Sequence, residues 1–269
     1  MAFGSDDVAS LALMLSAERL GALNKLTGSA QTSIELHQQT LRLSASLMVV
    51  IATIEIALRN AVCENLAQHF GVADWLQRPP LPFTWRTPEK QKISAAHDSA
   101  KRAMYAKLSQ RDKASLDVGI QQTGHSRSLS HVERVKARRK HIQVSEGQVV
   151  AELTLFFWKR LYGPEYDHWL WKPTLKRTFP HRTITRAKVA GELEKIYQAR
   201  NRIAHHEPVL HRRFYETLSA VEFVVQNMMV AEPNVSTPLA RLLSDDVRGV
   251  MLEAEHLHAR LDAFRLSAV

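Results

Sequence analysis

Apolar residues recur at intervals of three and four along nearly the whole chain, which is the spacing that lines one face of an α-helix. No stretch shows the alternation of apolar and polar residues that a half-buried β-strand requires. Glycine and proline, the residues that most often interrupt a helix, each occur only ten times in 269 residues. The sequence therefore predicts an all-α fold.

The expected helices are separated by segments that favour turns. A loop is expected where LQRPPLPFTWRTP (76–88) holds four prolines, and a flexible polar segment is expected at 118–131. We expect one helical domain over 1–230, with a basic insertion at about 90–145, and a C-terminal helical extension over 231–269 packed on it. The helices are expected at about 6–26, 32–70, 88–117, 147–162, 185–208, 210–230 and 237–265.

The most apolar run, LMVVIATIEIAL (47–58), is 12 residues long and includes Glu55. Because a membrane-spanning helix needs about 20 apolar residues, we expect this run to form a buried core helix. The first residues, MAFGSDDVAS, lack the basic region of a secretory signal. We therefore expect a soluble, cytoplasmic protein with no membrane partner.

The cysteine and histidine content gives no metal-binding pattern. The single cysteine, Cys63, excludes an internal disulfide and a cysteine-rich zinc site. Thirteen histidines are present, but no His-Glu-x-x-His motif and no glycine-rich phosphate loop accompanies them. We therefore expect no metal and no cofactor.

Positive charge is concentrated in the middle of the chain. Residues 101–141 carry 11 Lys or Arg against three Asp or Glu, in a protein whose net charge is +9 at pH 7. Such a segment can follow the phosphate backbone of RNA, and it can equally be a solvated helix face, so both interpretations stay open. The residues expected to contact RNA are Arg134, Lys136, Arg138, Arg139 and Lys140.

The string RNRIAHHEP (200–208) places an arginine and an asparagine shortly before a pair of histidines. Asn201 and His205 are four residues apart and share a helix face, whereas Arg200 and His205 point about 140° apart around the axis. Arg200 also falls on the apolar stripe of this helix, at a position where the pattern expects a leucine. A guanidinium there should meet a carboxylate or a phosphate, because an unpaired buried charge is costly.

A second Arg-Asn pair, in EIALRNAV (55–62), offers a partner for this arginine. Glu55 lies in an otherwise apolar helix and precedes Arg59 and Asn60. Glu55 can pair locally with Arg59 across one helical turn, or it can reach Arg200 on the other helix. Spacing alone does not decide between these two pairings.

Arginine, asparagine and histidine together suit the cleavage of RNA. A histidine titrates near neutral pH and can take the proton of a ribose 2′-OH, while an arginine stabilises the charge that develops on the phosphate. The alternative is an ordinary helix end, in which the histidines cap carbonyl groups and the arginine forms a salt bridge.

The chain resembles the Abi-like (abortive infection) family of the HEPN superfamily. The resemblance rests on five blocks in order, over roughly 15–215: LSAERLGAL (15–23), EIALRNAV (55–62), FFWKRLYGPEYDHWLW (156–171), Phe179-Pro180 and RNRIAHHEP (200–208). The segment at about 90–145 has no counterpart in the family pattern, and the aromatic block that usually precedes EIALRN is replaced by SIELHQQTLRLS.

The resemblance implies a HEPN-type helical bundle that acts as a metal-independent endoribonuclease, in phage defence or as a toxin. It assigns the catalytic roles to Arg200, Asn201 and His205, with His206 as a helper or a helix cap, and it leaves Glu55, Arg59 and Asn60 as supporting residues. It also implies a homodimer whose two chains build one composite site, with RNA as substrate and with a neutralising antitoxin, protein or RNA, as a further possible partner. The alternative is a non-catalytic RNA-binding or scaffold protein.

Overall fold

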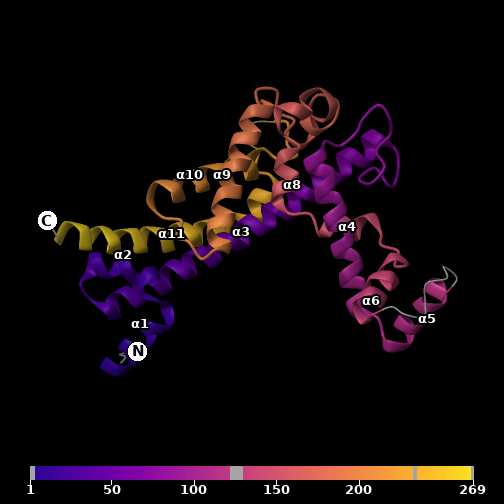
Figure 1. Ribbon diagram of the computed structural model, residues 1–269. Coiled ribbons are helices and arrows are strands. Elements are labelled where there is room, and N and C mark those ends of the chain that lie inside the picture. Colours follow the sequence, from indigo (N-terminus) through magenta and orange to yellow (C-terminus); the bar gives the residue numbers. More distant parts are fainter. Residues whose placement is uncertain (1–3, 122–129, 233–234, 268–269) are drawn as a thin grey trace. The chain divides into compact units, whose positions relative to one another are not determined.

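The computed structural model describes residues 4–121, 130–232 and 235–267, and within these ranges the protein is helical and has no β-strand (Figure 1). The expected all-α fold is confirmed. The elements are α1 (Ser5–Leu15), α2 (Ala17–Thr27), α3 (Ala30–Phe70), α4 (Thr87–Lys107), α5 (Gln110–Gln121), α6 (His131–Lys140), α7 (Glu146–Ala151), α8 (Leu155–Arg160), the short helices η1 (Pro164–Tyr166), η2 (Asp167–Trp171) and η3 (Leu175–Thr178), and then α9 (Arg186–Ala204), α10 (His211–Asn227) and α11 (Pro238–Ser267).

Three expected helices are each two helices in the structure. The break between α1 and α2 falls at Ser16, which adopts a φ of 69° and whose hydroxyl accepts a hydrogen bond from the Arg19 amide. A capping serine starts a new helix because it satisfies a free backbone N–H. Ser109 does the same for α5 by accepting from the Asp112 amide, and Thr154 stands at the start of α8.

Part of the segment 118–131, which was expected to be flexible, is helical in the structure. Helix α5 extends to Gln121, and residues 122–129 lie outside the described part of the chain. The sequence did not predict α6. Its start is a capping box, in which the Ser130 hydroxyl accepts from the Glu133 amide and the Glu133 carboxylate accepts from the Ser130 amide.

The chain divides into two compact units, and α3 runs through the boundary between them. The first unit comprises residues 1–61 and 176–269. Within it α9 lies along α10, and both α10 and α2 contact α11. Its core includes Leu47 and Ile51 of α3, Leu193 of α9 and Phe214 of α10, all at most 1% exposed.

The second unit comprises residues 62–175 and contains all five tryptophans. Phe83 and Trp85 meet edge to face, with ring centres 4.9 Å apart, and Phe157 and Tyr166 adjoin Trp85. Beside this cluster Glu89 is 1% exposed and accepts hydrogen bonds from the Arg160 side chain and the Tyr166 hydroxyl.

The division expected from the sequence, one domain over 1–230 with a C-terminal extension over 231–269, stays a prediction. The segment at about 90–145, expected as a basic insertion, lies in the second unit, where α6 and α7 both contact α4. Helix α11, in the expected extension, supplies buried residues such as Leu257 and Leu261 to the first unit. Both segments bury apolar side chains, and this binds each of them into a unit.

Among the described residues, one helix, α3, is long and apolar enough to cross a membrane by length and composition. One such helix is weak evidence of a membrane span, because the core helix of a soluble protein meets the same criteria. One side of α3 is the expected core face, on which Ile54 and Leu58 are fully buried. Another side carries Val49 and Ile56, which are 53% and 50% exposed.

Candidate functional site

The C-terminal end of α9 carries the expected catalytic string and ends in a well-defined cap. The Glu207 amide donates to the Arg202 carbonyl at 2.7 Å, and the His206 amide donates to the Ile203 carbonyl at 2.9 Å. Together with a φ of 56° at His206, these two bonds form a Schellman motif. Glycine usually occupies this left-handed position, so a histidine here carries backbone strain of about 1 kcal/mol.

Two arginines hold the backbone that follows the cap. The Arg19 side chain in α2 donates to the His206 carbonyl at 2.9 Å, across 187 residues of sequence. Arg202 donates from its Nε atom to the Pro208 carbonyl at 3.2 Å and pairs with the Glu207 carboxylate at 2.9 Å. Neither of these backbone contacts was predicted from the sequence. The signal for Arg19 was the LSAERLGAL block, where it follows the capping Ser16.

Arg200 does not lie on the buried stripe of α9, contrary to the expectation. The stripe continues from Ile196 through Ala199, which is 3% exposed, to Ile203, which is 8% exposed. Arg200 is half-buried at its edge, as is Asn201, whereas His205 and His206 are exposed. Ala199 occupies the position on the apolar face that the sequence pattern assigned to Arg200. The prediction was therefore wrong by one residue.

The ion pairs expected for Arg200 and Arg59 are not formed within the described part of the chain. Arg200 makes no hydrogen bond or ion pair with another described residue, and Arg59 donates only to the Asn60 side chain, at 3.4 Å. Glu55 and Arg59 are half-buried on α3, and Asn60 is exposed. The expected ion pair between Glu55 and Arg200 is therefore not formed.

The structure presents Arg200, Asn201 and His205 on one exposed helix end. No hydrogen bond links these three side chains to one another or commits them elsewhere among the described residues. They are thus available to a ligand. Because Arg200 and His205 point about 140° apart around the helix axis, this helix end alone does not bring the two side chains together.

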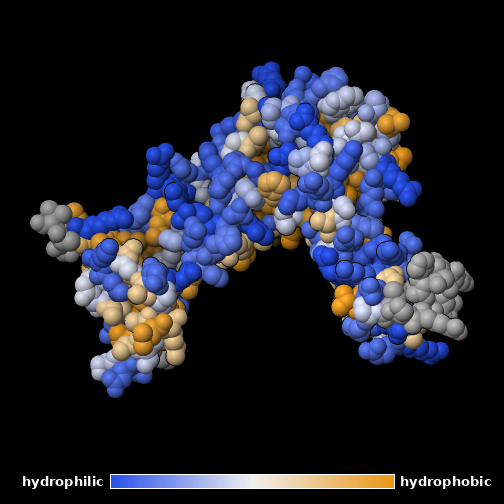
Figure 2. Space-filling model, viewed as in Figure 1, coloured by the Kyte–Doolittle hydropathy of each residue, from blue (hydrophilic) through white to orange (hydrophobic). Residues whose placement is uncertain are grey.

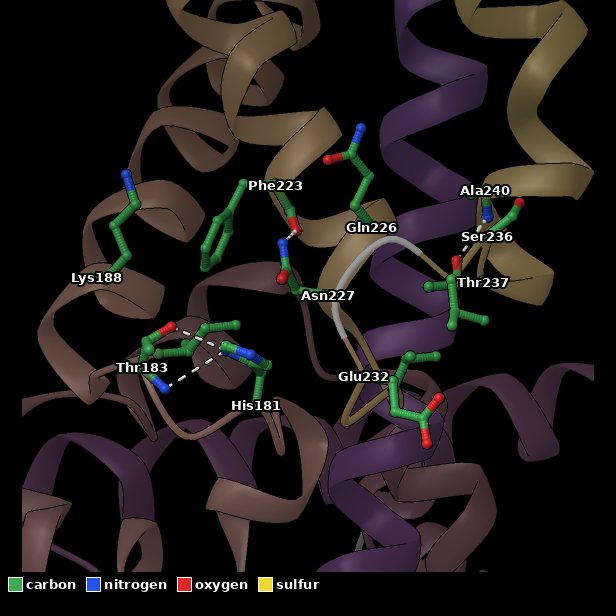
Figure 3. Close-up of a pocket in the computed structure, with 13 residues that line it drawn as sticks. His181, Thr183, Lys188, Phe223, Gln226, Asn227, Glu232, Ser236, Thr237 and Ala240 are labelled. Carbon is green, nitrogen blue, oxygen red and sulfur yellow. Dashed lines mark hydrogen bonds between the residues drawn. The ribbon is translucent and has the colours of Figure 1, made fainter.

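Of two pockets in the first unit, one adjoins this helix end and the other does not. One pocket, of about 750 Å³, is lined by polar residues such as His181, Lys188 and Asn227 and by Phe223, and it contains none of the expected site residues (Figure 3). Another pocket, of about 650 Å³, is walled on one side by His206, Glu207 and Pro208. The catalytic string therefore borders a pocket through its last three residues.

The basic segment in the second unit is only partly available to a ligand. Arg138 is held by Asp117 through two hydrogen bonds of 2.8 and 2.6 Å, and it also reaches the Tyr105 hydroxyl at 3.4 Å. These partners raise the pKa of Arg138 above its usual value, with the Asp117 hydrogen bond as the largest cause. Arg138 therefore forms an ion pair within the protein, and it is not the RNA-binding cation that the sequence predicted.

The other residues of this segment face solvent to different degrees. Arg134, Lys136 and Lys140 are exposed and Arg139 is half-buried, and the surface over α6 is mainly hydrophilic (Figure 2). Within residues 4–121, 130–232 and 235–267, no group of three or more His, Cys, Asp or Glu side chains is placed to hold a metal ion.

The chain matches no known family model, and comparison with curated proteins and with solved structures finds no significant match.

Proposed function

We propose that this protein is a metal-independent endoribonuclease of the HEPN type, of the Abi-like family. The observation that carries the proposal is the end of α9, where a half-buried Arg200, which has no partner among the described residues, stands five residues before an exposed His205. An arginine that is neither paired nor fully solvated is suited to bind a phosphate. The likeness of RNRIAHHEP and EIALRNAV to the family's blocks supports the same reading.

The proposed reaction needs only these side chains and the RNA itself. His205 accepts the proton of a ribose 2′-OH while the 2′-oxygen attacks the adjacent phosphorus. The bond from phosphorus to the 5′-oxygen breaks, and the 5′-oxygen takes up a proton donated by His206, the helper histidine. The products carry a 2′,3′-cyclic phosphate and a 5′-OH. Arg200 neutralises the charge on the phosphoryl oxygens, and the Asn201 amide orients the phosphate.

A second copy of the chain supplies what one helix end lacks. Arg200 and His205 point about 140° apart around the axis of α9, so one helix end does not aim both side chains at one phosphate. In a two-fold dimer each α9 end faces its copy, so that the arginine of one chain stands opposite the histidine of the other. We propose that this homodimer acts on RNA in the cytoplasm, in phage defence or growth arrest, under the control of an antitoxin.

Cleavage is expected to be lost when either residue is replaced. Purified protein incubated with RNA in EDTA should yield fragments with 2′,3′-cyclic phosphate ends, and Arg200→Ala or His205→Ala should slow this by about 10³-fold. Neither variant should lose more than about 0.5 kcal/mol of stability, because neither side chain has a described partner. Arg248→Ala and His256→Ala, exposed on α11, serve as matched controls. Equal cleavage by the Arg200 and His205 variants would contradict the proposal.

The exposed cations of α6 favour a second candidate function, a non-catalytic RNA-binding or scaffold protein. The double variant Arg134→Glu/Lys136→Glu should weaken RNA binding and reduce the slope of log K against log salt by about two, one for each lost phosphate contact. Arg248→Glu is the control for a general loss of positive charge. Filter binding across a salt series measures both quantities. RNA retention without any cleavage would favour this candidate, and an unchanged slope would exclude α6 from the RNA contact.

A further inference from the structure

The pocket that adjoins the α9 end has the composition of a ligand site. It lies within the first unit, between α2, α3, α11 and the residues that follow α9, and its volume is about 650 Å³. Pockets of this size hold small molecules or single units of a polymer. Its wall is apolar on one side, where Leu23, Leu26 and Leu261 line it, and charged along its rim.

His37 supplies an independent sign of a ligand. This residue of α3 lines the pocket and is only 7% exposed, yet its ring makes no hydrogen bond with another described residue. Burial, and to a lesser degree the positive charge of Arg19, lower the pKa of His37, so the ring is neutral near pH 7 and offers one donor and one acceptor. The ring nitrogens of His37 are not among the fully buried polar atoms that lack a partner, so they open on the pocket, where a bound ligand can pair with them.

The charged rim contains groups of both signs. Arg19 uses one nitrogen to hold the His206 carbonyl, and Arg265 uses one to pair with Asp262 at 2.9 Å, so both keep further N–H groups for an anion. The carboxylates of Glu18 and Glu207 stand on the same rim and can only accept hydrogen bonds when ionised.

We propose that this pocket binds one nucleotide of the RNA chain. A nucleotide combines a phosphate for Arg19 and Arg265, hydroxyl and amino donors for the two carboxylates, and a flat apolar face for the leucines. An aliphatic carboxylate would satisfy the arginines and the leucines, but it offers no donor to Glu18 or Glu207. The wall formed by His206 to Pro208 joins the pocket to the catalytic string, so the bound nucleotide flanks the cleaved bond; this placement rests on the proposed function.

The test uses the full chain carrying His205→Ala, which lacks the proposed base, and a fluorescent RNA oligonucleotide whose 2′-hydroxyls are intact. Arg265→Gln should raise the Kd measured by anisotropy by about tenfold, as expected for one charge-assisted contact. Leu26→Trp, which fills the apolar side and leaves the charges in place, should raise it at least as much. Arg248→Gln is the matched control, because Arg248 pairs with Asp245 on the same helix, three residues apart, as Arg265 does with Asp262. It should change the Kd by about twofold or less.

Competition identifies the ligand class. Adenosine monophosphate should displace the oligonucleotide from the parent protein and not from Leu26→Trp, and decanoate should not displace it from either. Competition by decanoate alone would overturn the nucleotide assignment, and so would a Kd that Arg265→Gln and Leu26→Trp leave unchanged or that Arg248→Gln raises equally.

The pocket and the cleavage proposal can fail separately. If the protein with His205 intact cleaves RNA and the pocket variants leave its KM unchanged, the pocket proposal is wrong and the cleavage proposal stands. If no protein cleaves RNA but the pocket variants weaken binding as stated, the pocket proposal stands and the cleavage proposal is wrong.

Discussion

Replacing Glu89 with alanine is expected to unfold or strongly destabilise the unit formed by residues 62–175. Glu89 is 1% exposed and accepts from Arg160 Nε and, at 2.7 Å, from the Tyr166 hydroxyl. Removing the carboxylate leaves the buried Tyr166 hydroxyl without its acceptor and leaves the half-buried Arg160 with Glu165, at 3.2 Å, as its carboxylate partner, which costs about 3 kcal/mol. The total stability of a domain is only about 5–15 kcal/mol, so this is a large share of it.

Tryptophan fluorescence reports the unfolding of the second unit, because all five tryptophans lie within residues 62–175. The midpoint of thermal unfolding should fall by about 10 °C or more. The unfolding midpoint of Glu89→Gln should lie between those of Glu89→Ala and the wild type, because the glutamine amide oxygen can still accept one of the two hydrogen bonds. Asp74→Ala is the control: its ion pair with Arg78, in the same unit, is largely exposed and should contribute less than about 1 kcal/mol. If Glu89→Ala and Asp74→Ala unfold at the same temperature, the cluster does not stabilise the unit.

The Glu89 cluster also shows what the sequence could not predict. The helical fold was predictable because the apolar spacing of α3, α9, α10 and α11 persists over several turns. Arg160, however, is 71 residues from Glu89, and nothing in either local sequence indicates the pairing. Within the basic segment, Asp117 looks like one of three scattered acids, and only the fold shows that it holds Arg138.

Local details near the candidate site escaped prediction for a different reason. The apolar pattern of α9 fits a stripe through Arg200 almost as well as one through Ala199, because a small apolar residue gives a weak signal. Ser16 likewise reads as one polar residue inside a long helical pattern, although its side chain ends one helix and begins the next. The sequence could place the catalytic string on a helix end, and it could not tell which side chains around that end were already bound to others.

Mixing two inactive variants is expected to restore RNA cleavage if the proposed site is built from two chains. A homodimer of Arg200→Ala has no Arg200 in the site, and a homodimer of His205→Ala has no His205. Their heterodimer keeps one Arg200 and one His205, each on a different chain, and both copies of His206. Random exchange makes half of the dimers heterodimers, so the mixture should recover about a quarter of wild-type activity when one of the two equivalent Arg–His pairs works.

A second mixture separates the composite site from other causes of recovery. Wild-type chain mixed with the double variant Arg200→Ala/His205→Ala gives heterodimers whose remaining arginine and histidine lie on the same helix, about 140° apart around its axis. These heterodimers should be inactive, so an excess of the double variant should suppress wild-type activity. The chains are denatured and refolded together to ensure exchange, and cleavage is measured in EDTA. If the first mixture recovers no activity and light scattering shows a dimer, each site needs both arginines and both histidines. If the first mixture recovers no activity, the double variant does not suppress wild-type activity and light scattering shows a monomer, the two-chain site is wrong.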